Sequence, residues 1–219
     1  ECLKPNSAHV APGDPFFLNS LNCAEFLTAD GIGIVYASRI LGGRIRERIT
    51  GMDVFQGVSE ALNRDGGASY FFLGSTNETL EAIRKRMADD YPNIEVAGTY
   101  SPPFRPEFTD EDNEKMVTAV NECAPDVLWV GMTAPKQEKW LCAQKDVLDV
   151  KFAGPIGAVF DFYVGNIDRA GPVWQKMGLE WLPRLVQEPR RLWRRVLVTG
   201  PRFILRTLHY RFSRSASSR

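Results

Sequence analysis

Short apolar segments alternate with helical patterns through the first 160 residues of the chain. The apolar runs predict strands at 68–73, 94–100, 127–132 and 152–159, and the helical spacing predicts helices at 52–63, 78–91 and 109–123 and a further helix from residue 135. Residues 32–40 fit either a helix or a strand. Buried strands that alternate with helices are typical of βα units, so the pattern predicts an α/β fold with a Rossmann-like, mostly parallel sheet flanked by helices.

The pattern changes near residue 178. From there apolar residues recur at helical spacing and arginines fill the positions between them, for example Leu192 and Trp193 between Arg191 and Arg194. This arrangement predicts a basic amphipathic helical appendage. We therefore expect an α/β domain over residues 1–183 and the appendage over residues 184–219.

Composition excludes several classes of protein. The 219 residues are 44% apolar and 25% charged, which is an ordinary globular mixture and not a disordered or fibrous one. The longest stretch without Asp, Glu, Lys or Arg runs only from Gly66 to Asn77. A membrane-spanning helix needs about 20 apolar residues, so none is predicted.

Charge is distributed unevenly although the chain is neutral overall. The last 36 residues hold ten arginines, no lysine and one acid, which gives this segment a charge of +9 and the rest of the chain −9. This positive charge predicts an anionic partner for the tail, which is a membrane surface, a nucleic acid or a phosphorylated substrate. The sequence contains no recognised DNA- or RNA-binding module, so we expect no nucleic acid partner.

The cysteines and the acidic residues do not suggest a metal site. Cys2, Cys23, Cys123 and Cys142 are scattered, without a C-x-x-C pair or a nearby His, which favours reduced cytosolic thiols over a zinc site or a disulfide framework. The D-x-D sequence at 110–112 follows Thr109 at an expected helix start. Acidic residues stabilise that position, so we favour helix capping over metal binding.

Several segments carry candidate chemistry. In Asp30-Gly31-Ile32-Gly33 a carboxylate stands beside two glycines, where it can act as a general base or cap a turn or a helix. Gly74 and Ser75 lie where a strand leads into a helix, so the backbone there forms either a phosphate site or an ordinary βα turn. For both segments the two interpretations stay open.

A second strand end carries the segment from Gly131 to Glu138. Pro135 fits the first position of a helix. Lys136 and Gln137 then fall in the first turn, where a cation opposes the helix dipole unless an anion is bound. We therefore predict that Gly131, Pro135, Lys136, Gln137 and Glu138 belong to a substrate site.

Asp161 is a lone acid within an aromatic run that begins at Phe160. A buried carboxylate needs a partner, either an arginine such as Arg169 or polar groups of a ligand, and both interpretations stay open. In the tail, Arg184, Arg190 and Arg191 carry the guanidinium forks that suit a diphosphate.

Together, and in order along nearly the whole chain, these motifs resemble the WecG/TagA/CpsF family of bacterial glycosyltransferases, glycosyltransferase family 26. The resemblance rests on Asp30–Gly33, Arg48 with Thr50–Asp53, Phe72–Ser75, Tyr91-Pro92 with Gly98, Pro125–Gly131, Pro135–Glu138, Gly157–Asp161 with Gly165, Arg169-Ala170, Gly178–Leu182, Arg184-Leu185 and Glu188–Arg191.

The resemblance implies an enzyme that transfers a sugar, of the N-acetylmannosamine type or a related hexose, from a UDP-sugar donor to a polyprenyl-diphosphate-linked acceptor. It implies inversion, no required metal and no cofactor. Asp30 matches the proposed catalytic base of the family, and Arg48 and Gln137 match polar positions of its active site. The family's Thr-x-Asn segment aligns with Lys4-Pro5-Asn6, so Asn6 matches a substrate contact whereas Lys4 replaces threonine.

The resemblance also implies a peripheral protein on the inner, cytoplasmic face of the bacterial plasma membrane, with self-association and a role in cell-surface or exopolysaccharide synthesis. Members usually begin with a further βα segment that this chain lacks. Two alternatives remain at this stage. One is a non-catalytic α/β module that binds membranes or polyanions. The other is a different nucleotide-using Rossmann-like enzyme, which the absence of G-x-G-x-x-G disfavours.

Overall fold

The computed structural model describes residues 1–168, 171, 174, 179–187 and 189–217. Arg169, Ala170, Gly178 and Glu188, which belong to the motifs above, lie outside the described residues, as do the side chains of Arg184 and Arg191. Contacts divide the chain into two compact units. The first comprises residues 1, 19–25 and 51–167, and the second comprises residues 2–18, 26–50 and 168–219.

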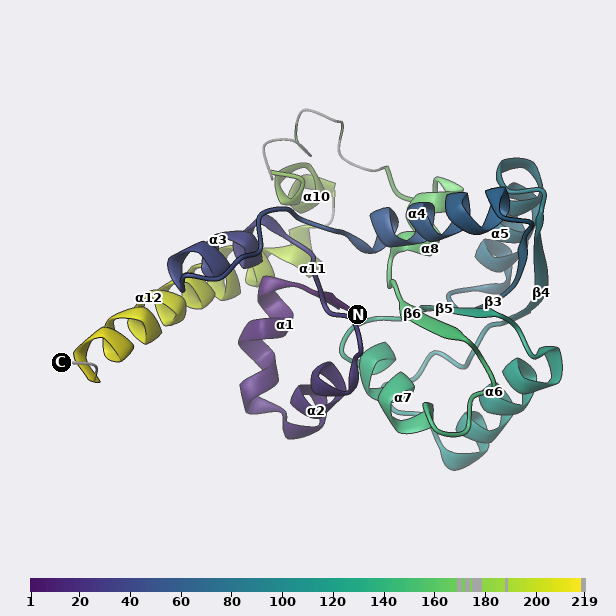
Figure 1. Ribbon diagram of the computed structural model, residues 1–219, viewed down its shortest axis with the longest axis horizontal. Coiled ribbons are helices and arrows are strands. Elements are labelled where there is room, and N and C mark those ends of the chain that lie inside the picture. Colours follow the sequence, from purple (N-terminus) through teal and green to yellow (C-terminus); the bar gives the residue numbers. More distant parts are fainter. Residues whose placement is uncertain (169–170, 172–173, 175–178, 188, 218–219) are drawn as a thin grey trace. The chain divides into compact units, whose positions relative to one another are not determined.

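The first unit contains a four-stranded, fully parallel sheet with the strand order β4-β3-β5-β6. Its elements in chain order are α4 (Gly51–Arg64), β3 (Ala68–Gly74), α5 (Asn77–Asp90), β4 (Ile94–Tyr100), α6 (Asp110–Cys123), β5 (Val127–Gly131), α7 (Lys136–Gln144), β6 (Phe152–Pro155) and α8 (Val159–Val164). Helices flank the sheet in Figure 1. The predicted α/β fold with a parallel sheet is confirmed.

Side chains of β3 alternate between two apolar clusters, as strand geometry requires. Tyr70 and Phe72 pack with residues of α4, α5 and α8, whereas Phe71 and Leu73 pack with residues of α6 and α7. The sheet is therefore buried on both faces. This explains why β3 is apolar at successive positions instead of at every second one.

One predicted strand ends earlier in the structure than expected, and one segment that the sequence left open is now assigned. Strand β6 ends at Pro155, not at residue 159, and Gly157 turns the chain with φ 60° before α8 begins at Val159. A short apolar run fits a buried strand and a buried helix equally well, so its periodicity could not locate this boundary. Residues 32–40, which the sequence left open, form a helix.

Helix α6 begins as the acidic sequence predicts. The Thr109 hydroxyl accepts a hydrogen bond from the Asp112 N–H at 3.2 Å, and the Asp112 carboxylate accepts one from the Thr109 N–H at 2.9 Å. Asp112 also pairs with Arg105 at 3.1 Å. The helix-capping interpretation of the D-x-D sequence is thus confirmed.

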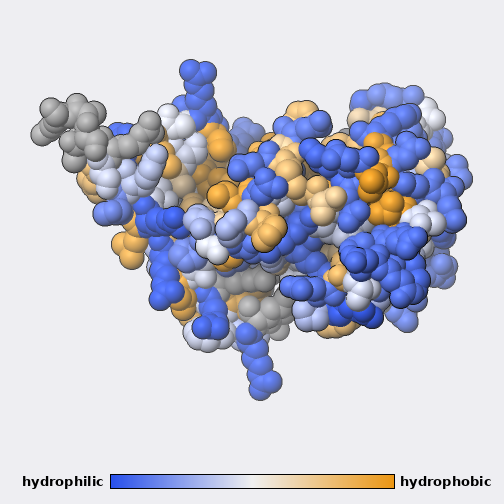
Figure 2. Space-filling model, turned by 90° about the horizontal axis from the view of Figure 1, so that it is seen from below, coloured by the Kyte–Doolittle hydropathy of each residue, from blue (hydrophilic) through white to orange (hydrophobic). Residues whose placement is uncertain are grey.

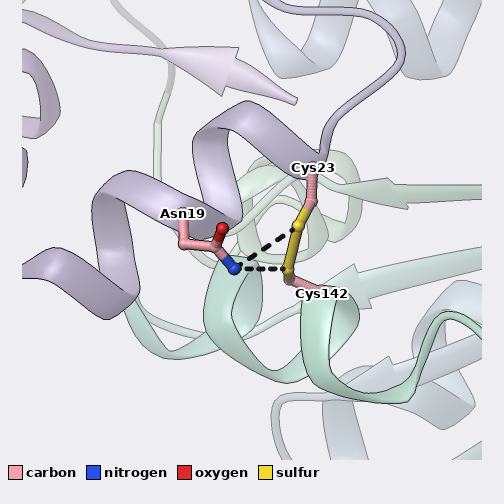
Figure 3. Close-up of a disulfide and its surroundings, with 3 residues drawn as sticks. All are labelled: Asn19, Cys23 and Cys142. Carbon is pink, nitrogen blue, oxygen red and sulfur yellow. Dashed lines mark hydrogen bonds between the residues drawn. A yellow bond between two sulfur atoms is a disulfide. The ribbon is translucent and has the colours of Figure 1, made fainter.

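The expectation of reduced thiols is wrong for two cysteines. Cys23, at the end of α2 (Pro15–Cys23), and Cys142 of α7 form a disulfide with their Cα atoms 6.0 Å apart, and the Asn19 side chain donates to both sulfur atoms at 3.7 Å (Figure 3). The two cysteines are 119 residues apart in sequence. Their pairing depends on how the helices pack, which cysteine spacing does not reveal.

The second unit is mainly helical and includes a small two-stranded parallel sheet of β1 (Cys2–Leu3) and β2 (Thr28–Ala29). Its helical elements are α1 (Pro5–Val10), η1 (Ala11–Gly13), the first turn of α2, α3 (Ile32–Ile40), α10 (Trp181–Gln187), α11 (Pro189–Trp193), the π-helix η2 (Arg194–Thr199) and α12 (Gly200–Ser217). Within the described part of the chain, no helix combines the length and the apolar character that crossing a bilayer requires.

Candidate active site

The first unit brings two predicted segments together where β3 and β5 end. A Cβ atom on Gly74, which has φ 122°, would come within 2.5 Å of the Gly131 carbonyl oxygen, so only glycine permits this approach. From β3 the chain passes through α5 to β4 on one side, and from β4 through α6 to β5 on the other side of β3. Ligands of open α/β sheets bind at such a topological switch point.

Ser75 continues this turn in a left-handed conformation, with φ 56°. Its carbonyl oxygen accepts a hydrogen bond from the Ser101 hydroxyl at 2.7 Å, which joins the loops that follow β3 and β4. Thr76 then caps α5, because its hydroxyl accepts from the Thr79 N–H at 3.3 Å. The turn therefore leads directly to the positive end of a helix of 14 residues.

Gln137 and Glu138 are almost fully buried, with exposed fractions of 3% and 5%. The Gln137 side chain accepts a hydrogen bond from the Met132 N–H at 3.2 Å and donates one to the Glu138 carboxylate at 2.9 Å. Pro135 follows a cis peptide bond and precedes α7 as its N-cap residue. Gln137 therefore holds the loop after β5 through its hydrogen bond with Met132, and Glu138 orients the Gln137 side chain.

Lys136 lies against the loop between β4 and α6. Its ammonium group donates to the Arg105 carbonyl oxygen at 2.6 Å and lies 3.4 Å from the centre of the Phe108 ring. Burial lowers the pKa of Lys136, partly offset by the negative charge of Asp112. Sequence reasoning missed Ser101, Arg105 and Phe108, although a Pro-rich loop after a strand was a signal that this segment lies at the same edge of the sheet.

Phe160 and Asp161 have different surroundings on α8. The Phe160 side chain is 2% exposed, packs edge-on against Phe72 at 5.5 Å between ring centres and fills the space beside Gly131. Its observed contacts are those of a core residue. Asp161 is half-buried, and the Asn166 side chain donates to its carboxylate at 3.5 Å.

In the second unit, Asp30 follows β2 directly. Its N–H donates to the Leu3 carbonyl oxygen at 2.9 Å, and its carboxylate forms an ion pair with the Lys4 ammonium group at 3.1 Å. The N-cap residue of α3 is Gly31, with φ 125° and no side-chain capping bond. The contact found for the Asp30 carboxylate among the described residues is the ion pair with Lys4, and the side chain has an exposed fraction of 15%.

The two glycines of the Asp-Gly segment contact the start of α1. A Cβ atom on Gly31 or Gly33 would lie 3.0 or 2.9 Å from the ring of Pro5. This close packing brings the first turn of α1, which carries Asn6, against the segment that carries Asp30. Asn6 is half-buried.

Arg48 forms an ion pair with Glu180 within the second unit. Arg190 is exposed on α11, and Arg184 and Arg191 lie on α10 and α11. The predicted site residues therefore form two sets. Gly74, Ser75, Gly131, Pro135, Lys136, Gln137, Glu138, Phe160 and Asp161 belong to the first unit, and Asn6, Asp30, Arg48, Arg184, Arg190 and Arg191 belong to the second.

Comparison with known proteins identifies the family to which the chain belongs. The family model of the glycosyl transferase WecG/TagA/CpsF family matches residues 2–217. The chain belongs to this family. It is accordingly a glycosyltransferase, and the resemblance of its motifs is confirmed.

Several proteins with sequences similar to this glycosyltransferase have names that state an enzymatic activity. The N-acetylglucosaminyldiphosphoundecaprenol N-acetyl-beta-D-mannosaminyltransferase of Bacillus subtilis (strain 168) is 30% identical over 94% of this chain and 77% of its own length. Proteins with the same name from Bacillus spizizenii and Staphylococcus aureus (strain MW2) are 28% and 27% identical, over 94% and 87% of this chain and 77% and 72% of their own lengths.

Proposed function

We propose that this glycosyltransferase moves an N-acetylmannosamine-type sugar from a UDP-sugar to a polyprenyl-diphosphate-linked saccharide that ends in N-acetylglucosamine, during synthesis of a cell-surface polymer. The names of the relatives support the transferred sugar and the acceptor. The observation that carries the chemistry is the Asp30 carboxylate, which is held by Lys4 through one oxygen and remains partly accessible.

In the proposed reaction Asp30 accepts the proton of the acceptor hydroxyl as that oxygen attacks the anomeric carbon of the donor sugar. The bond from this carbon to the diphosphate breaks, and UDP leaves with the electron pair. A single displacement of this kind inverts the anomeric configuration. General base catalysis contributes typically about 10² to 10⁴ in rate.

The departing diphosphate needs positive charge and N–H donors. In our proposal the candidates for these groups are Lys136 and the Gly74-Ser75 turn in the first unit. The candidates in the second unit are Arg48, Arg184, Arg190 and Arg191. We propose no metal ion in this step. We propose that the donor nucleotide binds at the ends of β3 and β5, and the topological switch point there supports this proposal.

The polyprenyl chain of the acceptor lies in a bilayer, and α12 has the character of an interfacial helix. It buries Phe203 in the cluster that contains Ile34 and Val35 of α3 and leaves Ile204, Leu205 and Phe212 exposed among Arg202, Arg206 and Arg211. Figure 2 shows apolar side chains interspersed with hydrophilic ones over this part of the molecule. We propose that α12 binds the anionic inner face of the plasma membrane. Self-association through the same apolar side chains is the alternative.

Release of UDP from a panel of UDP-sugars tests this function. The assay contains EDTA throughout and is run with and without a lipid-diphosphate-linked N-acetylglucosamine acceptor. We expect acceptor-dependent release with UDP-N-acetylmannosamine that disappears in Asp30→Asn while donor binding is kept. The proposal would be refuted if no donor gave acceptor-dependent UDP release, or if Asp30→Asn released UDP as fast as the wild type.

A further inference from the structure

Lys4 and Asp30 occupy matching positions at the ends of two parallel strands. Strand β1 pairs with β2 in the register Cys2 to Thr28 and Leu3 to Ala29, so the next residue pair in this register is Lys4 with Asp30. The hydrogen bond from the Asp30 N–H to the Leu3 carbonyl oxygen extends the pairing by one step. The backbone therefore sets the two side chains beside each other.

The ion-pair contact lies at one oxygen of the Asp30 carboxylate. The Lys4 ammonium group lies 3.1 Å from Oδ2 of Asp30. In the part of the chain that the structure describes, no hydrogen bond to Oδ1 of Asp30 is found. Asp30 is 15% exposed and Lys4 is 47% exposed. The shielded position of the carboxylate strengthens its attraction to the ammonium group relative to a pair in open solvent.

From this geometry we infer that Lys4 is a positioning residue, which holds the Asp30 carboxylate by Oδ2 so that Oδ1 faces the acceptor hydroxyl. The inference rests on the proposed function, in which Asp30 is the general base. Lys4 itself takes no proton and touches no reacting atom in this scheme. A base that rotates away from the hydroxyl by about 1 Å can lose about 10² in rate, so fixing one oxygen has a measurable effect on turnover.

The experiment compares Lys4→Met, which removes the ammonium group and keeps most of the stem, with Lys4→Arg, which keeps a cation. Steady-state kinetics use UDP-N-acetylmannosamine and the lipid-linked N-acetylglucosamine acceptor. We expect Lys4→Met to lower kcat about tenfold or more, with KM for either substrate within about twofold of the wild type. Lys4→Arg should recover most of kcat, which a loss of packing alone would not explain.

Lys115→Met is the matched control, because Lys115 also pairs with a carboxylate, that of Glu111 at 2.6 Å on α6, and is absent from the proposed site. Its kcat should stay within about twofold of the wild type. Wild-type kcat in Lys4→Met together with an inactive Asp30→Asn would overturn the role of Lys4 and leave the proposed function intact. An active Asp30→Asn would instead refute Asp30 as the base, so the two failures are distinguishable.

A crystal structure of Lys4→Met gives a readout that does not depend on turnover. We expect the Asp30 carboxylate to rotate or to occupy more than one orientation once the ammonium group is removed. A carboxylate that keeps the wild-type orientation would also overturn the positioning role. Because Lys4 is about half exposed, we expect the variant to fold, and its melting temperature checks this.

Discussion

Arg48 and Glu180 form a two-contact ion pair although 132 residues separate them in sequence. The guanidinium nitrogens NH1 and NH2 lie 2.8 and 3.1 Å from the two carboxylate oxygens, and both side chains are about one-fifth exposed. Two parallel contacts of this type are stronger and more directional than a single surface contact. The pair therefore joins the segment before α4 to the turn residue that precedes α10.

We expect Glu180→Gln to lower the free energy of unfolding by about 1–2 kcal/mol, since it removes the negative charge that faces a partly buried guanidinium. Urea unfolding of Glu180→Gln, Arg48→Met and the double variant measures the coupling between the two residues. The double variant should lose less than the sum of the single losses. Additive losses would show that the two groups do not stabilise each other.

Gly74 should not tolerate alanine. The added Cβ would come within 2.5 Å of the Gly131 carbonyl oxygen, and φ 122° is unfavourable for any residue with a side chain. We expect Gly74→Ala to cost about 2–4 kcal/mol of stability by urea unfolding. Gly57→Ala is the control, because Gly57 lies within α4 and a Cβ there would meet open space, so alanine should stabilise by about 0.5–1 kcal/mol. Equal effects at the two sites would contradict this account.

The disulfide between Cys23 and Cys142 should contribute to stability by restricting the unfolded chain. It closes a loop across 119 residues, for which chain entropy predicts about 4–5 kcal/mol and typical measurements give about 2–4 kcal/mol. We expect dithiothreitol to lower the melting temperature of the wild type. The Cys23→Ser/Cys142→Ser protein should melt at the lower temperature with or without the reductant. A melting temperature of the wild type that is insensitive to complete reduction would argue against this contribution.

Asp126 should make stability depend on pH in the acid range. Its carboxylate pairs with Lys151 at 2.6 Å and accepts hydrogen bonds from the N–H and hydroxyl of Ser69 at 2.8 and 3.0 Å, and these contacts lower the pKa of Asp126 to about 2. An unfolded aspartate has a pKa of about 3.9, so the unfolded chain binds more protons between these values. The stabilisation is therefore complete above about pH 4–5 and is lost as the pH falls through about 2.

Asp126→Asn tests this dependence. At pH 7 we expect a loss of about 1 kcal/mol, because solvent around the 84% exposed Lys151 screens much of the attraction. The difference between variant and wild type should shrink as the pH approaches 2 in urea titrations. Glu111→Gln, which removes an exposed ion pair on α6, should change stability by less than about 0.5 kcal/mol at pH 7. A difference for Asp126→Asn that persists unchanged at pH 2 would rule out the ionic origin.

Local physics let the sequence predict much of the first unit. Strand β4 has the predicted bounds of 94–100, and α6 begins after Thr109 because a capping threonine followed by acids stabilises that position in any context. The helical character of residues 184–187 and 189–212 was likewise predicted, since the 3.6-residue period of apolar and basic positions depends only on the chain itself. Family motifs depend on residue identity and order, so the sequence also determined membership of the glycosyltransferase family.

Tertiary structure alone decided which distant groups meet. The sequence indicated Asp30 and Arg48 as site residues. It did not indicate that Asp30 pairs with Lys4 or that Arg48 pairs with Glu180. It also did not indicate the disulfide between Cys23 and Cys142. It also gave no sign that Gln137 is buried beneath the loop after β5. The reason is physical. Periodicity and capping act over a few residues, whereas these contacts require segments up to 132 residues apart to be brought together by strand pairing and helix packing.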